Sequence, residues 1–250
     1  YVRFFFYRDD MGECNYPPAI QAHILKKHFT VFPELSKDAI FFHDCDFVFT
    51  KYFDFEPFIH DENWYFSDTR SYVASEYIES KGRGLLEGMC QVVGLCACTV
   101  RAKKESSGGA QKLMKNLTAA YWEEVETDSI NLYNWLLQEK DNYGEAEVND
   151  IQVWTASMWS ELWNAWKHGH NVIVPEEFDF AWATCSVAKW DSLSFYHNAG
   201  VVSDKNGMFF KAAYVNTFPY HENLELSPDR CSSKYFEMVK KTGETSVLID

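Results

Sequence analysis

The stretch AIFFHDCDFVFT, residues 39–50, joins an apolar run to two aspartates, Asp44 and Asp46, that stand one residue apart. The pattern predicts a strand that breaks at Asp44 and a second short strand after Asp46. Alternate residues of a strand point to the same side, so both carboxylates can face one point. Two close, ionised carboxylates repel each other unless a cation lies between them, and a divalent cation with oxygen ligands meets that need. A solvated turn at a strand end is the alternative.

Strand-like and helix-like spacings of apolar residues alternate along the rest of the chain. The spacing predicts strands over 2–10, the start of 64–75, 88–100, 178–186 and 207–215. It predicts helices over 16–35, 149–169 and 232–243, and one that follows the glycine pair at the start of 108–140. This alternation predicts an α/β fold in a single domain over residues 1–250, with a central mixed sheet flanked by helices.

The composition supports a large core and argues against a polyanion-binding protein. Of the 250 residues, 46% are hydrophobic and 17% aromatic, and the formal net charge is −14. Such a charge opposes wholesale binding to nucleic acid. One basic stretch, RAKKESSGGAQKLMK (101–115), could still form a local track together with Lys81 and Arg83. A solvated loop is the alternative interpretation of that stretch.

The cysteines and the hydropathy pattern indicate the cellular compartment in which the protein is expected. None of the seven cysteines follows a metal-binding CxxC spacing. Cys96 and Cys98 stand two residues apart, on one face of the strand predicted over 88–100. We expect all seven to be free thiols in a reducing compartment, the cytoplasm. No run of 18 apolar residues and no signal peptide is visible, so we expect no membrane span.

The segment AIFFHDCDFVF resembles the DxD motif of GT-A-fold glycosyltransferases, in which an apolar strand precedes D-x-D. Four further stretches follow in the order and spacing of that family: SDTRSYVAS (67–75), SSGGAQKLMKN (106–116), NDIQVWTASMWSELW (149–163) and FYHNAGV (195–201). The set looks most like phage, viral and uncultivated-genome glycosyltransferases related to the kinetoplastid enzyme that glucosylates hydroxymethyluracil in DNA, the step that forms base J. The resemblance covers roughly residues 35 to 225.

The resemblance implies a GT-A-like, Rossmann-like fold and a metal centre. Asp44 and Asp46 would bind Mn²⁺ or Mg²⁺, which holds the diphosphate of a nucleotide-sugar, by resemblance UDP-glucose. His197 would complete the metal site, with His221 as the weaker alternative. Family members place two or three strands before the DxD motif, whereas only 43 residues precede Asp44 here. The resemblance therefore implies an abbreviated or truncated N-terminal part.

The glycine-rich segment is expected to hold the donor. Gly108 and Gly109 would let the backbone approach a sugar or phosphate closely. Ala110 and Gln111 would follow at a helix start, whose free N–H groups favour anions, and Gln111 could bind sugar hydroxyls. Lys112, like Lys103 and Lys104, could neutralise the leaving diphosphate. A plain turn between a strand and a helix is the alternative.

Two acids are candidates for the general base of an inverting transfer: Asp150 first and Asp68 second. Asp150 and Gln152 open the tryptophan-rich helix predicted over 149–169, where an acid can also serve only as a helix cap. Asp68 and Gln152 are also expected to contact the donor. The acceptor implied by the resemblance is a hydroxymethylated pyrimidine in DNA, and a phage protein would act in the host cytoplasm. A glycan, protein or small-molecule acceptor, or a binding module without turnover, remains open.

Overall fold

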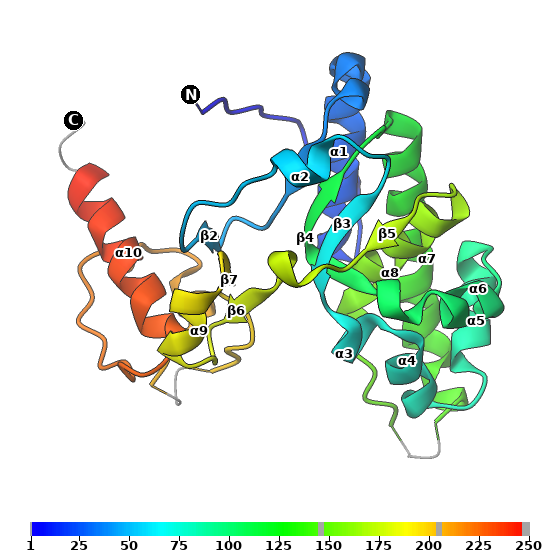
Figure 1. The fold of residues 1–250 in the computed structure, drawn as a ribbon. Coiled ribbons are helices and arrows are strands. Elements are labelled where there is room, and N and C mark those ends of the chain that lie inside the picture. The colour runs from blue at the N-terminus through cyan, green and yellow to red at the C-terminus, as the bar shows by residue number, and fades with distance from the viewer. Residues whose placement is uncertain (1, 145–147, 204–206, 247–250) are drawn as a thin grey trace. The chain divides into compact units, whose positions relative to one another are not determined.

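Residues 2–144, 148–203 and 207–246 are described by a computed structural model, drawn in Figure 1. They form two compact units. Unit 1 contains the described residues up to Phe42 and from Glu56 to Pro175. Unit 2 contains His43 to Phe55 and the described residues from Glu176 onward. The α/β class with mixed sheets is confirmed, while the GT-A-like single domain stays a prediction.

Unit 1 is built on a four-stranded mixed sheet. Its strand order is β1-β4-β3-β5, with β4 antiparallel to both neighbours and β3 parallel to β5. A bulge interrupts the β3–β4 pairing between Phe66 and Ser67, opposite the segment that contains Ala110. The strands are β1 (Ile40–Phe42), β3 (Trp64–Asp68), β4 (Gly108–Met114) and β5 (Val172–Ile173). The strand predicted before the break at Asp44 and the strand predicted at the start of 64–75 are confirmed as β1 and β3.

The core of unit 1 lies along helix α7, which packs against both α1 and α8, and α8 also contacts β4 (Figure 1). Trp159, Trp163 and Trp166 of α8 are buried there, so these tryptophans of the tryptophan-rich helix belong to the core. The helices of the unit are α1 (Ile20–Val31), α2 (Glu56–Ile59), α3 (Arg70–Val73), α4 (Ser75–Lys81), α5 (Leu85–Val93), α6 (Ala97–Ala102), α7 (Ala119–Glu139) and α8 (Ala156–Lys167). Short 3-10 helices are η1 (Pro17–Ala19), η2 (Pro33–Lys37), η3 (Lys104–Ser106), η4 (Lys140–Asn142) and η5 (Val153–Thr155).

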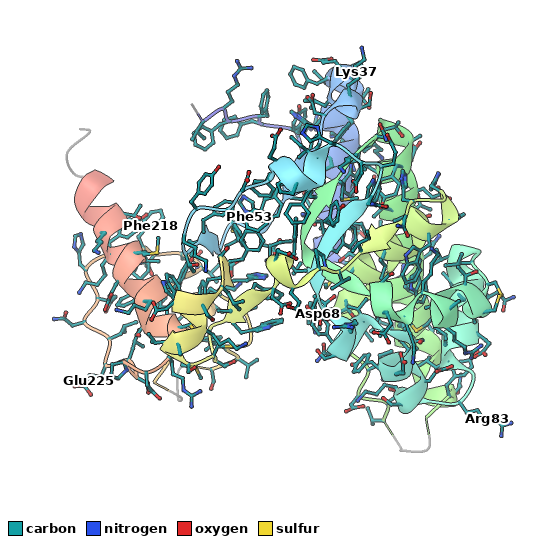
Figure 2. The ribbon with its side chains drawn as sticks, viewed as in Figure 1. Lys37, Phe53, Asp68, Arg83, Phe218 and Glu225 are labelled. Atoms are coloured by element: carbon teal, nitrogen blue, oxygen red, sulfur yellow. A yellow bond between two sulfur atoms is a disulfide. The ribbon has the colours of Figure 1, made fainter. Side chains whose placement is uncertain are left out.

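Unit 2 is built on a three-stranded sheet in the order β2-β7-β6, with β2 antiparallel and β6 parallel to β7. A cluster of phenylalanines packs beside it: Phe53 lies 4.6 Å from Phe195 and 5.3 Å from Phe178 between ring centroids (Figure 2). The elements are β2 (Phe47–Phe49), η6 (Glu176–Phe178), β6 (Phe180–Trp182), α9 (Val187–Ser192), β7 (Phe195–His197), η8 (Lys211–Tyr214) and α10 (Cys231–Ser246).

The strand predicted over 2–10 is wrong. The described residues of this segment have no regular secondary structure, and Val2, Phe4 and Phe6 are exposed. Phe5 packs its ring against His28 of α1, with 4.7 Å between centroids. A strand needs a partner for its backbone groups, and apolar composition alone does not supply one.

The strand predicted over 88–100 is also wrong, because the segment forms α5 and α6. Gly94 adopts a left-handed conformation (φ 75°) that ends α5, as glycine often does after a helix. The buried residues Leu85, Met89 and Val93 recur every four positions, which is helical spacing. The expectation that Cys96 and Cys98 are free thiols is wrong too, since a disulfide joins them. Their Cα atoms lie 5.2 Å apart, within the usual range for such a bond.

Two smaller corrections concern the predicted site, and a third concerns a predicted strand. Ala110 and Gln111 lie inside strand β4 and not at a helix start. Helix α8 begins at Ala156, so Asp150 precedes it by a 3-10 turn and is not its cap. The strand predicted over 207–215 is wrong, because this segment forms no strand and contains the 3-10 helix η8. The helices predicted over 16–35 and 232–243 are confirmed as α1 and α10, and the one predicted within 108–140 is confirmed only from Ala119, as α7. No helix among the described residues is both long and apolar enough to cross a membrane.

Candidate metal centre

The three residues predicted as metal ligands lie together in unit 2. Asp44, Asp46 and His197 each offer one ligand atom, and these atoms all lie within 4.8 Å of one another. The His197 Nε2 atom is 3.3 Å from Asp44 Oδ2 and 3.3 Å from Asp46 Oδ1. One imidazole nitrogen thus faces both carboxylates, an arrangement that could hold a metal ion.

Strand pairing places this group. Strands β2 and β7 run antiparallel with Phe47 opposite His197, so the residues just before β2 lie beside the end of β7. The Asn198 N–H donates to the Asp46 carbonyl oxygen (3.1 Å), which extends that pairing by one step. The Phe47 N–H donates to the Asp44 carbonyl oxygen (3.2 Å) and closes a turn. The carboxylates therefore converge through a turn, whereas the sequence suggested strand alternation.

The imidazole is buried and its ring is held by aromatic neighbours. Trp182 of β6 lies opposite His197 in the sheet and stacks on it, with 6.4 Å between centroids and 15° between ring planes. Burial alone would lower the pKa of His197, but its hydrogen bonds to Asp44 and Asp46 outweigh burial and raise the pKa to about 9. Without a metal, Nε2 therefore carries a proton at neutral pH.

Lys211 is a member of the site that the sequence did not predict. Its ammonium group, from η8, donates to Asp46 Oδ2, the carboxylate oxygen that does not face His197. Burial raises the pKa of Asp46, but hydrogen bonds from His197 and Lys211 outweigh burial and lower it overall. The contact joins residues 165 positions apart in the chain, so no local spacing signals it.

The donor set fits a divalent cation. Two carboxylate oxygens and one neutral imidazole nitrogen are ligands that Mn²⁺ accepts readily, and Mg²⁺ accepts the oxygens. Asp46 is buried, with 10% of its side chain exposed, whereas the Asp44 side chain is 54% exposed. The ligand group is thus anchored on one side and open on the other. The weaker alternative ligand, His221, is exposed and is not part of the group.

The predicted donor-binding glycines belong to unit 1, in β4, and both lie close to side chains of that unit. A Cβ atom on Gly108 would lie 2.6 Å from the Phe66 Cβ atom. A Cβ atom on Gly109 would lie 2.5 Å from Cε of Met158. At position 108 the Cβ atom would also lie 2.8 Å from the Ser67 carbonyl oxygen, so packing inside unit 1 by itself requires glycine there. Cε of Met158 is the end of a flexible side chain that could move aside, so packing does not by itself require glycine at position 109.

The next three residues of β4 are engaged within unit 1. Ala110 has a positive φ of 55° at the β-bulge, a conformation that residues with a side chain seldom adopt. The Ser67 hydroxyl donates to Gln111 Oε1 (2.9 Å) in the interior. Lys112 forms a buried ion pair with Glu161 of α8, with 2.5 Å between Nζ and Oε2. Binding of the donor by these residues stays a prediction.

Asp68 lies at the end of β3, opposite Gly108 in the sheet register (Figure 2). Arg70 donates to its carboxylate through the backbone N–H (2.9 Å) and through the guanidinium (2.6 Å). The hydrogen bond from the Arg70 side chain is the main cause that lowers the pKa of Asp68. Asp68 therefore stays ionised at neutral pH and is a weak base.

Asp150 is 81% exposed and pairs with Lys81 at 2.9 Å. The hydrogen bond from Lys81 lowers the pKa of Asp150. Asp150 lines a pocket of about 790 Å³ in unit 1, which also contains Glu79, Glu87 and Arg101. Gln152 is exposed, and its backbone N–H donates to the Tyr77 hydroxyl (3.0 Å).

The basic stretch 101–115 is largely neutralised by acids of unit 1. Ion pairs join Arg101 to Glu79 and Glu87, Lys104 to Glu76, Lys112 to Glu161 and Lys115 to Asp61. Arg83 is exposed and extends away from the ribbon (Figure 2). Four of the five basic residues in 101–115 are thus paired with carboxylates, two of them, Lys112 and Lys115, in buried positions.

Comparison with protein-family profiles, with curated proteins and with solved structures finds no match to this chain. The case for its function therefore rests on the chemistry of its own side chains.

Proposed function

We propose that this protein is a metal-dependent glycosyltransferase that moves a hexose, glucose by resemblance, from a nucleotide-sugar to a hydroxyl group. The observation that carries the proposal is the convergence of Asp44, Asp46 and His197 at the DxD-like segment. Paired carboxylates with a histidine suit an ion that must bind both the protein and a diphosphate. Mn²⁺ or Mg²⁺ with UDP-glucose is the expected donor complex.

A bound divalent ion would supply charge neutralisation for the departing nucleoside diphosphate. Asp46 and His197 would hold it from the buried side and Asp44 from the open side. The Lys211 ammonium, 54% exposed, would exchange its contact with Asp46 for the diphosphate oxygens. This is the role that the sequence assigned to Lys112, whose ammonium is instead buried against Glu161.

The acceptor hydroxyl needs a base if the transfer inverts configuration. Asp150 and Asp68 remain the proposed bases. Both carboxylates are ionised at neutral pH, and the cations beside them lower their pKa values further, which weakens them as bases. Each would have to leave its present partner, Lys81 or Arg70, to take up a proton. Asp150 is the more accessible of the two because it is far more exposed.

The neutralised basic stretch favours an acceptor other than duplex DNA. A DNA-binding face needs unpaired cations for the phosphates, and four of the basic residues in 101–115 are paired with carboxylates. We therefore place a glycan, protein or small-molecule hydroxyl ahead of a hydroxymethylated pyrimidine in DNA. The net charge of −14 points the same way.

The test is release of nucleoside diphosphate from a panel of nucleotide-sugars, with and without Mn²⁺. We expect release from one donor, dependent on the metal and lost in Asp44→Asn. Asp44 suits this test because its side chain is largely exposed, so the substitution should leave the fold intact. Asp229→Asn, at a 75% exposed side chain in unit 2, is the matched control. Metal-dependent donor binding without release, in every acceptor mixture tried, would indicate a binding module instead.

A further inference from the structure

The disulfide between Cys96 and Cys98 lies at the surface of unit 1, and both residues are exposed. Ala97 between them is buried, and Val100, one turn further along α6, is fully buried. These two side chains anchor α6 to the core of unit 1, while the two sulfurs stay on the solvent side. Both sulfurs are therefore open to attack by a small thiol without unfolding of the unit.

This disulfide contributes little to holding the fold together. It closes a loop of only three residues, and a disulfide restricts the unfolded chain less as its loop becomes shorter. The start of α6 is already formed by the backbone, because the Thr99 and Val100 N–H groups donate to the Cys96 carbonyl oxygen at 2.9 and 3.4 Å. The unit should therefore keep its structure when the bond is reduced.

We propose that Cys96 and Cys98 form a thiol–disulfide exchange site for low-molecular-weight thiols and disulfides. The Cys98 N–H donates to Cys96 Sγ at 3.2 Å, which favours negative charge on that sulfur. Cys96 is therefore the better leaving group when the disulfide is attacked and the more readily ionised thiol when the pair is reduced.

The exchange balances with an external thiol, RSH, as the reductant. One RS⁻ attacks Cys98 Sγ, the bond between Sγ atoms breaks, and Cys96 leaves as a thiolate. A second RS⁻ attacks the external sulfur of the mixed disulfide and releases the Cys98 thiolate and RSSR. The two protons of the external thiols end on Cys96 and Cys98, and two electrons pass from the external thiols to the protein.

Other cysteines of the chain provide internal comparisons. Cys90, six residues before Cys96, is buried, and burial raises the pKa of its thiol to about 12. It should remain an unreactive thiol under the same conditions. Cys45 is exposed and stands between two proposed metal ligands, so the experiment replaces it by serine.

The test equilibrates the full chain carrying Cys45→Ser with mixtures of reduced and oxidised glutathione. Thiols are then trapped with an alkylating reagent, and the peptide containing Cys96 and Cys98 is analysed by mass spectrometry. We expect one reversible two-electron transition with the same midpoint from either starting state, and an unmodified Cys90. Because the bond adds little to the stability of the fold, the midpoint for the native pair should lie within about tenfold of that for the urea-unfolded chain.

The single variants Cys96→Ser and Cys98→Ser should stop at a mixed disulfide with glutathione. Two results would overturn the proposal. One is a disulfide that glutathione reduces only when urea unfolds the chain, which would make it a structural bond. The other is accumulation of glutathione on both residues of the native pair, which would make them independent thiols. Neither result depends on the glycosyltransferase proposal, since no donor or metal is present.

Discussion

Two of the buried charge clusters among the described residues are built in opposite ways. In unit 1, Lys112 and Glu161 form one closed pair, with 8% and 6% of their side chains exposed. In unit 2, two carboxylates share one imidazole and one ammonium, and Asp44 and Lys211 are each about half exposed. The first cluster has one cation for one anion. In the second, the carboxylate oxygens of Asp44 and Asp46 contact cationic groups that a metal ion could displace.

The difference shows which buried charges can serve a ligand. A closed pair has no exchangeable group that a ligand could replace. Removal of either partner would destabilise the fold, because the other charge would stay buried and uncompensated. An open cluster holds exchangeable cations, here a proton on His197 and the ammonium of Lys211, in the place where a divalent ion could bind. Burial and charge are common to both clusters, so access and spare ligand atoms distinguish the candidate site.

The largest effect should come from breaking the closed pair. Lys112→Met leaves Glu161 buried without its cation, and we expect the free energy of unfolding to fall by about 3–5 kcal/mol. Urea denaturation measures this loss. Lys112→Met combined with Glu161→Leu removes both charges and should recover most of it. A loss below about 1 kcal/mol in the single variant would mean that the pair is not truly closed.

The next effect separates the two candidate histidine ligands. His197→Gln keeps a group that can hydrogen-bond both carboxylates but removes the ligand nitrogen, so Mn²⁺ affinity should fall about 10- to 100-fold. Isothermal titration calorimetry with Mn²⁺ measures the change. His221→Gln is the matched control and should leave the affinity unchanged, because His221 lies outside the group. Equal losses in both variants would contradict the assigned ligand set.

The proton on His197 gives the open cluster a pH dependence. Its pKa of about 9 lies above the ordinary value of 6.5. The proton therefore stabilises metal-free unit 2 fully below pH 6.5, and this contribution is lost as the pH rises through 9. Mn²⁺ affinity should move the opposite way, because the ion displaces that proton, and rise by up to about tenfold per pH unit.

Calorimetry at pH 6.5, 7.5 and 8.5, in buffers of different ionisation enthalpy, would show the released proton directly. His197→Gln should abolish the pH dependence across this window. An affinity that stays constant between pH 6.5 and 8.5 in the native chain would mean that the metal does not bind at Nε2 of His197.

The open cluster could be predicted largely from sequence because its key features are local. The break at Asp44 and the short strand after Asp46 appear in one twelve-residue stretch, and His197 stands in a short motif of its own. Lys211 could not be predicted, because its only signal is a contact across 165 positions. The closed pair could not be predicted for the same reason. Lys112 lies in β4 and Glu161 in α8, and no local sequence pattern links the two residues.

The predictions of secondary structure fail where one local sequence pattern is compatible with two different structures. The apolar run 88–100 suits a strand or a buried helix, and the glycines that delimit α5, Gly84 and Gly94, decide for helix. The strand predicted over 2–10 depended on a partner that composition cannot supply. The glycine pair at 108–109 suggested a ligand, but its contacts with Phe66 and Met158 could be seen only in three dimensions.

The smallest effect we predict is that of Lys211→Met, and it completes the comparison with Lys112→Met. The Lys211 side chain is 54% exposed, so solvent screens its pairing with Asp46 and the free energy of unfolding should fall by less than about 1 kcal/mol. Mn²⁺ alone should bind about two- to fivefold more tightly, because a competing cation has left Asp46. The nucleoside diphosphate should bind more weakly to the Mn²⁺-loaded protein, because Lys211 is the proposed contact for its oxygens.

Lys189→Met, at an exposed lysine of α9, serves as the control for charge alone. Weaker binding of Mn²⁺ itself would show that Lys211 organises the ligands instead of competing with the ion, and the cluster of unit 2 would then resemble the closed pair of unit 1.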